Sequence, residues 1–201
     1  MSKWGRVATE LCLEEFNWAI QLRRLISQID GSEVELRRIL LEQATEEEKH
    51  GRMLQAIAAI EKENPLIGKT SKAISHWFAY DFSIHQCVPC SIEGTRKRRK
   101  TLQLILEKPI FDYPVDFQLG FVLLVEIAGK IFYSILSKIS SPALRGVSKA
   151  IAADESDHIF ALARLFFRRP NAIAILIFWV WRISKAMPCG MRELISILSE
   201  E

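Results

Sequence analysis

Residues 121–133 read Phe-Val-Leu-Leu-Val-Glu-Ile-Ala-Gly-Lys-Ile-Phe-Tyr. Between Phe117 and Leu136 the only charged side chains are Glu126 and Lys130. Apolar residues recur there at steps of three and four, which predicts a helix with Glu126 on its buried face. A buried carboxylate costs several kcal/mol unless a proton, a basic side chain or a metal ion compensates it. The fold must therefore supply a counterpart for Glu126.

Proline, glycine and capping residues divide the rest of the chain into helix-like segments. Asp30-Gly31 ends the first segment, and Ser32 with Glu35 three residues later predicts a capping box for the second. No two-residue alternation typical of strands occurs. The core helices are expected over residues 3–29, 32–63, 114–139 and 141–169. We therefore predict an all-α fold.

Two further segments complete the predicted single domain, 1–201. A long crossover joins the second and third helices and includes short helices over 71–82 and 95–106. Pro170 opens an apolar extension, 170–201, in which Pro188-Cys-Gly separates a last short helix. Two helical hairpins joined by the crossover, with extra C-terminal helices, form the simplest four-helix bundle from these elements.

The composition limits the class of protein. The 201 residues are 49% hydrophobic and 25% charged, which is typical of a folded globular chain. A net charge of +3 is too small to indicate a nucleic-acid partner by itself. Four cysteines without a signal sequence favour a reducing compartment, so we expect a cytoplasmic protein.

Two motifs in the crossover have more than one interpretation. Cys87-x-x-Cys90, with His85 nearby, is either half of a zinc site, a redox pair or two unpaired thiols, and unpaired thiols are the default. The basic run Arg96–Lys100 is usually a solvated face; the alternatives are contact with RNA, anionic lipid or an acidic partner.

The longest apolar run, residues 172–181, is shorter than the roughly 18 residues of a membrane-spanning helix. It is apolar around its whole circumference, so something must cover it. We expect it to pack on the bundle or at a homodimer contact, and peripheral membrane contact is the alternative.

Two Glu-x-x-His pairs suggest what compensates the buried carboxylates. Glu47 precedes His50 by three residues, and Glu155 precedes His158 by three. Residues three apart share a helix face, so each pair can bind one cation through an oxygen and a nitrogen. The helix before each pair carries one unexplained core glutamate, Glu15 or Glu126. The alternative is a salt bridge from these glutamates to Arg23 or Lys130, with the histidines as ordinary core residues.

This pattern resembles the ferritin-like di-iron carboxylate superfamily, of the rubrerythrin and di-iron oxygenase type. The resemblance covers roughly residues 5–60 and 115–168. It rests on four segments: Leu13-Glu-Glu-Phe-Asn-Trp-Ala, Glu46-Glu-Glu-Lys-His-Gly, Leu124-Val-Glu-Ile-Ala-Gly and Asp154-Glu-Ser-Asp-His. It implies two iron ions, or iron with manganese, on six ligands: Glu15, Glu47, His50, Glu126, Glu155 and His158. Oxygen and imidazole ligands suit these metals better than a structural zinc site.

Three more residues are candidates for supporting the ligands. Asp154 and Glu46 each precede a ligand glutamate, and in related proteins an acid there bonds the outer nitrogen of the opposite histidine. Tyr133 lies two turns beyond Glu126 and is either a neighbour of the site or an ordinary core tyrosine. Glu14, Glu48 and Asp157 lie off the buried face and are expected to be solvated.

The resemblance implies an O2-activating oxidase or oxygenase with a small or hydrophobic substrate and an electron donor that the sequence does not identify. Large apolar residues expected around the site suit such a substrate: Phe16, Trp18, Leu54, Phe121, Val122 and Phe160. Iron oxidation and storage, as in bacterioferritin-like proteins, is the alternative. A non-enzymatic helical scaffold is a third interpretation.

Overall fold

The computed structural model describes the backbone of residues 3–60 and 110–199 and most of their side chains, and everything described is helical or a turn. The helices are α1 (Lys3–Gln28), α2 (Val34–Ile60), α5 (Val115–Ile139), α6 (Pro142–Phe166) and α7 (Ala172–Ser199), with a short 3-10 helix η1 (Ile110–Asp112). The all-α prediction is confirmed. The short helices expected over 71–82 and 95–106 lie outside the described residues.

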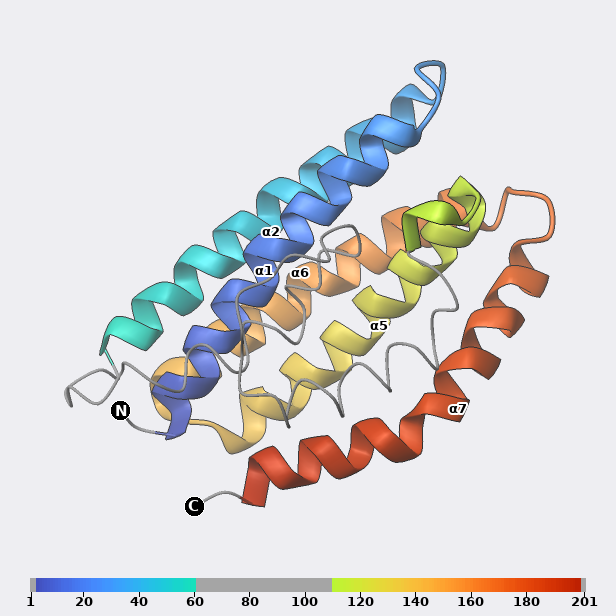
Figure 1. Ribbon diagram of the computed structural model, residues 1–201. Coiled ribbons are helices and arrows are strands. Elements are labelled where there is room, and N and C mark those ends of the chain that lie inside the picture. The colour runs from blue at the N-terminus through green and yellow to red at the C-terminus, as the bar shows by residue number, and fades with distance from the viewer. Residues whose placement is uncertain (1–2, 61–109, 200–201) are drawn as a thin grey trace.

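Two antiparallel hairpins form the body of the molecule (Figure 1). α1 packs along α2, α5 packs along α6, and the hairpins meet mainly where α2 contacts α6. α2 ends at the opposite end of the molecule from the start of α5, as a long crossover requires. This arrangement places one face of each of these four helices toward a common interior.

The turns explain where the helices begin. The Ser32 hydroxyl donates to Asp30 Oδ1 at 2.6 Å instead of capping a helix, so the predicted capping box is wrong and α2 begins two residues later, at Val34. Ser141 does cap α6, because its hydroxyl accepts a 3.5 Å bond from the Leu144 N–H. Pro142 follows at the first helical position, where a missing N–H costs nothing.

α6 ends at Phe166, three residues earlier than predicted, and the chain then reverses through Asn171, whose φ is 64°. Asparagine tolerates this left-handed conformation better than most residues. Arg169 fixes the turn, since its guanidinium pairs with Glu33 and lies 2.6 Å from Asp116 Oδ1. One arginine thus joins the turn to the starts of α2 and α5.

α7 is a single helix, so the prediction of separate C-terminal helices is wrong. Its axis bends along its length (Figure 1). A proline inside a helix removes one hydrogen bond and bends the axis without ending the helix, and Pro188 lies in the second half of α7. Pro188 was predicted to end a helix, but a proline is equally compatible with a kink inside a continuous helix.

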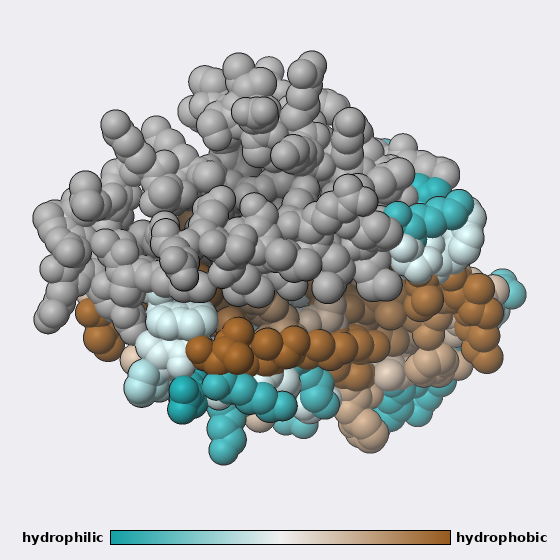
Figure 2. All heavy atoms as spheres, turned by 90° about the horizontal axis from the view of Figure 1, so that it is seen from below, coloured by the Kyte–Doolittle hydropathy of each residue, from teal (hydrophilic) through white to brown (hydrophobic). Residues whose placement is uncertain are grey.

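The first half of α7 covers α5 with one face. Trp179 is fully buried, donates from its indole to the Phe117 carbonyl at 2.8 Å and packs against Phe121 with the rings tilted and their centroids 5.1 Å apart. The opposite face is exposed and carries four large apolar side chains: Ile173, Ile177, Val180 and Trp181. Figure 2 shows apolar side chains gathered in a band on one side of the molecule. Peripheral membrane contact and dimer contact through this segment stay predictions.

By length and composition, α5 is the one helix among the described residues that is apolar enough to cross a membrane. Its sequence does not form an uninterrupted apolar run, because Glu126 and Lys130 divide it. Packing explains the composition equally well, since α5 lies against both α6 and α7 and 44% of its most apolar window is buried.

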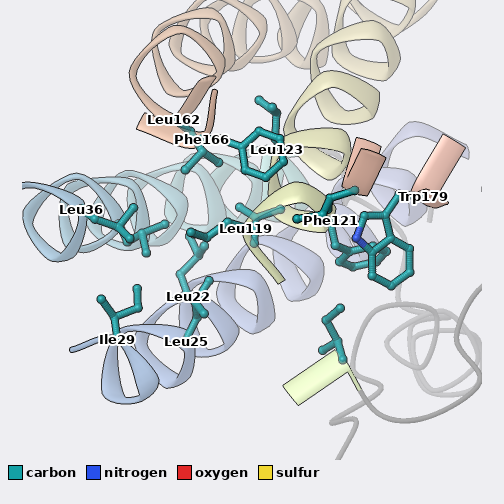
Figure 3. Packing of buried hydrophobic residues seen from close by; sticks show 14 of the residues in the cluster. Leu22, Leu25, Ile29, Leu36, Leu119, Phe121, Leu123, Leu162, Phe166 and Trp179 are labelled. Carbon is teal, nitrogen blue, oxygen red and sulfur yellow. The ribbon is translucent and has the colours of Figure 1, made fainter. Parts of the chain in front are cut away.

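The hydrophobic core consists of two separate clusters. The larger one joins residues of all five helices, among them Leu22, Leu119, Leu162 and Trp179 (Figure 3). The smaller one lies nearer the other ends of the helices and includes Leu11, Leu54, Tyr133 and Ile151. In each of α1, α2, α5 and α6 the residues between the two clusters include buried acids or histidines. A polar layer therefore crosses the interior.

Candidate metal centre

The polar layer brings together the six residues that the sequence singled out as ligands. α1 and α5 each contribute one glutamate, and α2 and α6 each contribute a glutamate and a histidine one helical turn apart. None of the six is more than 7% exposed: Glu15, Glu47, His50, Glu126, Glu155 and His158. Six ionisable groups in a dry layer need a strong mutual or external compensation.

The six residues form two overlapping groups. The first holds Glu15 and His50 with Glu47 and Glu155, and the second holds Glu126 and His158 with the same two glutamates. Within each group one donor atom from every residue lies within 4.8 Å of the others. The geometry could therefore hold two cations at adjacent positions that share Glu47 and Glu155.

The distances around the two histidines show that the two oxygens of Glu47 face different histidines. Glu47 Oε2 lies 3.2 Å from Nδ1 of His50, and Glu47 Oε1 lies 3.4 Å from Nδ1 of His158. The two imidazole rings are 6.2 Å apart between centroids. One carboxylate thus presents one oxygen to each position, which is the arrangement that a ligand between two ions needs.

The outer nitrogens of the histidines contact acids from the opposite helix. His50 Nε2 lies 3.0 Å from Asp154 Oδ2, and His158 Nε2 lies 2.5 Å from Glu46 Oε2. An ionised carboxylate only accepts, so each Nε2 carries a hydrogen and each Nδ1 faces the buried glutamates of the layer. Although burial opposes it, the bond to His50 and the nearby Lys49 hold the pKa of Asp154 below its usual range.

Two aromatic donors bind the glutamates of α1 and α5. The Trp18 indole N–H donates to Glu126 Oε1 at 2.8 Å, and the Tyr133 hydroxyl donates to Glu15 Oε1. Tyr133 is therefore a neighbour of the site and not only a core residue. Trp18 was predicted as part of the apolar lining and not as a donor to a glutamate, although its position three residues after Glu15 puts it on the same helix face.

The salt-bridge alternative does not fit the structure. Arg23 lies 2.5 Å from Glu48 on the outside of the hairpin, and Lys130 is exposed. Among the residues that the structure describes, no arginine or lysine pairs with Glu15 or Glu126. Within residues 3–60 and 110–185, the basic side chains that contact these carboxylates are the two histidines.

Burial changes the protonation of the layer. It raises the pKa of Glu155 to about 10 and that of Glu15 well above its usual range, with neighbouring carboxylates adding to both shifts. The pKa of Glu126 is lowered despite burial, because His158, Glu155 and Trp18 bond to its charged form. Without a cation, the layer therefore holds protons that an ion would displace.

Unpartnered oxygens test whether the layer fits a metal. Glu47 Oε1 and Glu155 Oε2 are buried and lack a hydrogen-bond partner. They belong to the two glutamates that both groups share. Such atoms cost free energy in a purely protein-filled core, whereas carboxylate oxygens and imidazole nitrogens are the donors that iron and manganese bind. The residues present fit a pair of such ions.

A narrow cleft between α1, α5 and η1 lies beside the layer. It holds about 300 Å³ of empty volume, counting the open space at its mouth, and is lined by Trp18, Gln21, Leu22, Leu25, Ile110, Phe111, Gln118, Phe121 and Val122. Trp18 belongs both to this lining and to the contacts of Glu126. Of the other apolar residues expected around the site, Phe160 is 74% exposed and points away from it, so that expectation is wrong.

Comparison with known proteins finds no matching protein family, no matching curated protein and no matching solved structure. The candidate centre therefore rests on its own geometry. Cys87, Cys90 and the basic run Arg96–Lys100 lie outside the described residues.

Proposed function

We propose that the polar layer binds two iron ions, or one iron and one manganese ion, and that the chain is a ferritin-like di-iron carboxylate protein. The observation that carries this proposal is the pair of overlapping ligand groups with two shared glutamates. Four carboxylates balance the charge of two divalent ions, so that the metal-loaded layer is neutral while the histidines stay uncharged. The fold supports the proposal through its two antiparallel hairpins and long crossover.

Each residue has a distinct role in this proposal. Glu15 and His50 hold one ion, Glu126 and His158 hold the other, and Glu47 and Glu155 lie between them. Asp154 and Glu46 orient the two imidazoles. The apolar clusters on both sides exclude bulk water from the layer.

We infer that the activity is that of an O2-activating oxidase or oxygenase. When bound, a pair of redox-active ions supplies the electrons for the reduction of O2. The chain positions the ions in a dry environment. The lining of the narrow cleft beside Trp18 is mostly apolar, which favours a small or hydrophobic substrate over a charged one. Each turnover requires reducing equivalents from an external donor.

Metal analysis tests the centre. We expect about two ions per chain after reconstitution with iron(II), together with the near-ultraviolet absorption of a ferric pair after exposure to air. The Glu126→Ala and His158→Ala variants should lose at least half of this metal. Glu48→Ala is the matched control, because Glu48 is adjacent to Glu47 but pairs with Arg23 outside the layer. Full metal content in the first two variants would rule out this ligand assignment.

Oxygen consumption and particle size then separate the candidate activities. An oxidase or oxygenase consumes O2 repeatedly when a chemical reductant is supplied and elutes as a small species in size exclusion. A storage protein oxidises only the iron that it receives and forms a large cage. A non-enzymatic helical scaffold binds no iron, or retains a vestigial metal without consuming O2.

A further inference from the structure

The two glutamates that are not shared between the groups, Glu15 and Glu126, each accept a hydrogen bond from a different aromatic side chain. Trp18 comes from α1, as Glu15 does, but donates to Glu126 on α5. Tyr133 comes from α5, as Glu126 does, but donates to Glu15 on α1. The two helices thus exchange aromatic donors across the interior, in the same way that α2 and α6 exchange acids.

Each donor occupies one oxygen and leaves the other toward a histidine. Glu126 Oε1 accepts from Trp18, while Glu126 Oε2 lies 3.1 Å from His158 Nδ1. Glu15 Oε1 accepts from Tyr133, while Glu15 Oε2 lies 3.9 Å from His50 Nδ1. A carboxylate held in this way offers a cation one oxygen in a fixed direction.

The two positions also differ in their surroundings. Trp18 lines the apolar cleft with its ring while its N–H bonds Glu126. Tyr133 is 3% exposed and belongs to the smaller apolar cluster, which closes the Glu15 side. The aromatic donor is therefore open to the cleft at one position and enclosed at the other.

On the basis of the proposed two-metal function, we propose that Trp18 and Tyr133 are positioning residues for separate ions. Trp18 orients Glu126 for the ion on His158, and Tyr133 orients Glu15 for the ion on His50. Removing either donor frees one glutamate to rotate. The affinity for the ion on that glutamate then falls, while the other ion stays bound. Loss of a group that orients a metal ligand typically lowers metal affinity by about 10- to 100-fold.

Manganese(II) alone is the probe, and the free ion is measured by its electron paramagnetic resonance signal during titration of the metal-free protein. The shared glutamates couple the two ions, so the titrations use two backgrounds with one histidine removed. His158→Ala retains the position on His50, and His50→Ala retains the position on His158. In the His158→Ala background, Tyr133→Phe should lower the affinity for the remaining manganese ion by at least about tenfold. Trp18→Phe should change that affinity by less than about twofold.

In the His50→Ala background we expect the opposite effects of the two variants on the affinity for manganese(II). Trp18→Phe should then weaken binding and Tyr133→Phe should not. Equal effects of both variants in each background, or the opposite pairing, would overturn the proposal. A native chain that binds no manganese and no iron would overturn the two-metal function itself, so the two failures are distinguishable.

A loss of packing must be separated from a loss of the hydrogen bond. At position 18, replacing tryptophan by its benzothienyl analogue keeps the shape of the ring but exchanges the N–H for sulfur, and it should weaken binding as Trp18→Phe does. Trp179→Phe is the matched control, because the buried Trp179 indole also donates a 2.8 Å bond, to the Phe117 carbonyl outside the layer. Unchanged affinity with the analogue at position 18 would show that packing alone matters there and would refute the role of the N–H.

Discussion

Nε2 of His50 on α2 lies 3.0 Å from Oδ2 of Asp154 on α6. This contact fixes the imidazole so that Nδ1 faces Glu47 and the interior. We expect Asp154→Asn to lower the affinity for iron(II) by about 10- to 100-fold, because the amide no longer enforces one tautomer of His50. Equilibrium titration measures the change. Asp157→Asn is the control, since Asp157 is an exposed acid on the same helix, and equal losses in both variants would contradict the role of Asp154.

The metal-free protein should lose stability as the pH rises from about 5.5 to 8.5. Burial raises the pKa of Glu155 to about 10, so the folded chain keeps a proton that the unfolded chain releases above its ordinary value of 4.5. The free energy of unfolding then falls with pH throughout that window, by at most about 1.4 kcal/mol per unit for each such proton. Glu15 and His158 act in the same direction, because the pKa of each is also raised.

Thermal unfolding of the metal-free protein across this pH range measures the effect. Glu155→Gln should flatten the dependence, since an amide does not titrate. Stabilisation by added iron(II) should increase with pH over the same range, because ions displace the protons. A metal-free protein that becomes more stable between pH 5.5 and 8.5 would contradict the prediction.

The contact between α5 and α7 should depend on Gly120. A methyl group added at Gly120 would lie 2.8 Å from Ile175 Cγ2 and 3.2 Å from the Phe166 ring, which is closer than packed atoms approach. Gly120→Ala should therefore destabilise the fold by about 1–3 kcal/mol in chemical denaturation. Gly146→Ala on α6 is the control, because nothing lies within 4 Å of the added methyl group. It should raise stability by up to about 1 kcal/mol through helix propensity, and equal effects of the two variants would show that α7 does not pack closely on α5.

The exposed face of α7 should bind membranes if the prediction of peripheral contact holds. Its outward side chains are apolar from Ile173 to Trp181, and Lys185 lies over the Trp181 ring with Nζ 3.6 Å from the centroid. Flotation with vesicles that contain phosphatidylglycerol measures the association, and Ile177→Glu should abolish it. Leu41→Glu is the control, since Leu41 is an exposed apolar residue on α2. A native chain that does not float with the vesicles would contradict the prediction of membrane contact. A stable dimer that Ile177→Glu dissociates would indicate that a second copy covers this face.

The sequence by itself determined that the chain is helical and which face of each of the four bundle helices is buried. Helical periodicity is local, so the spacing around Glu126, Glu47 and His50 was enough to place these groups inside. The sequence left the boundaries open, because Ser32 and Pro188 each suit more than one local conformation. The Glu-x-x-His spacing also predicted that a carboxylate and an imidazole share one helix face, without showing which groups lie opposite them. Whether metal binds there stays a prediction.

Only the tertiary structure decided which side chains meet across helices. Trp18 and Glu126 are 108 residues apart, and His50 and Asp154 are 104 apart. Such contacts depend on the rotation and axial shift of each helix against its neighbours, which the packing of both apolar clusters sets together. The sharing of Glu47 between two positions and the exchange of aromatic donors follow from that packing, because periodicity within one helix carries no information about the register of another.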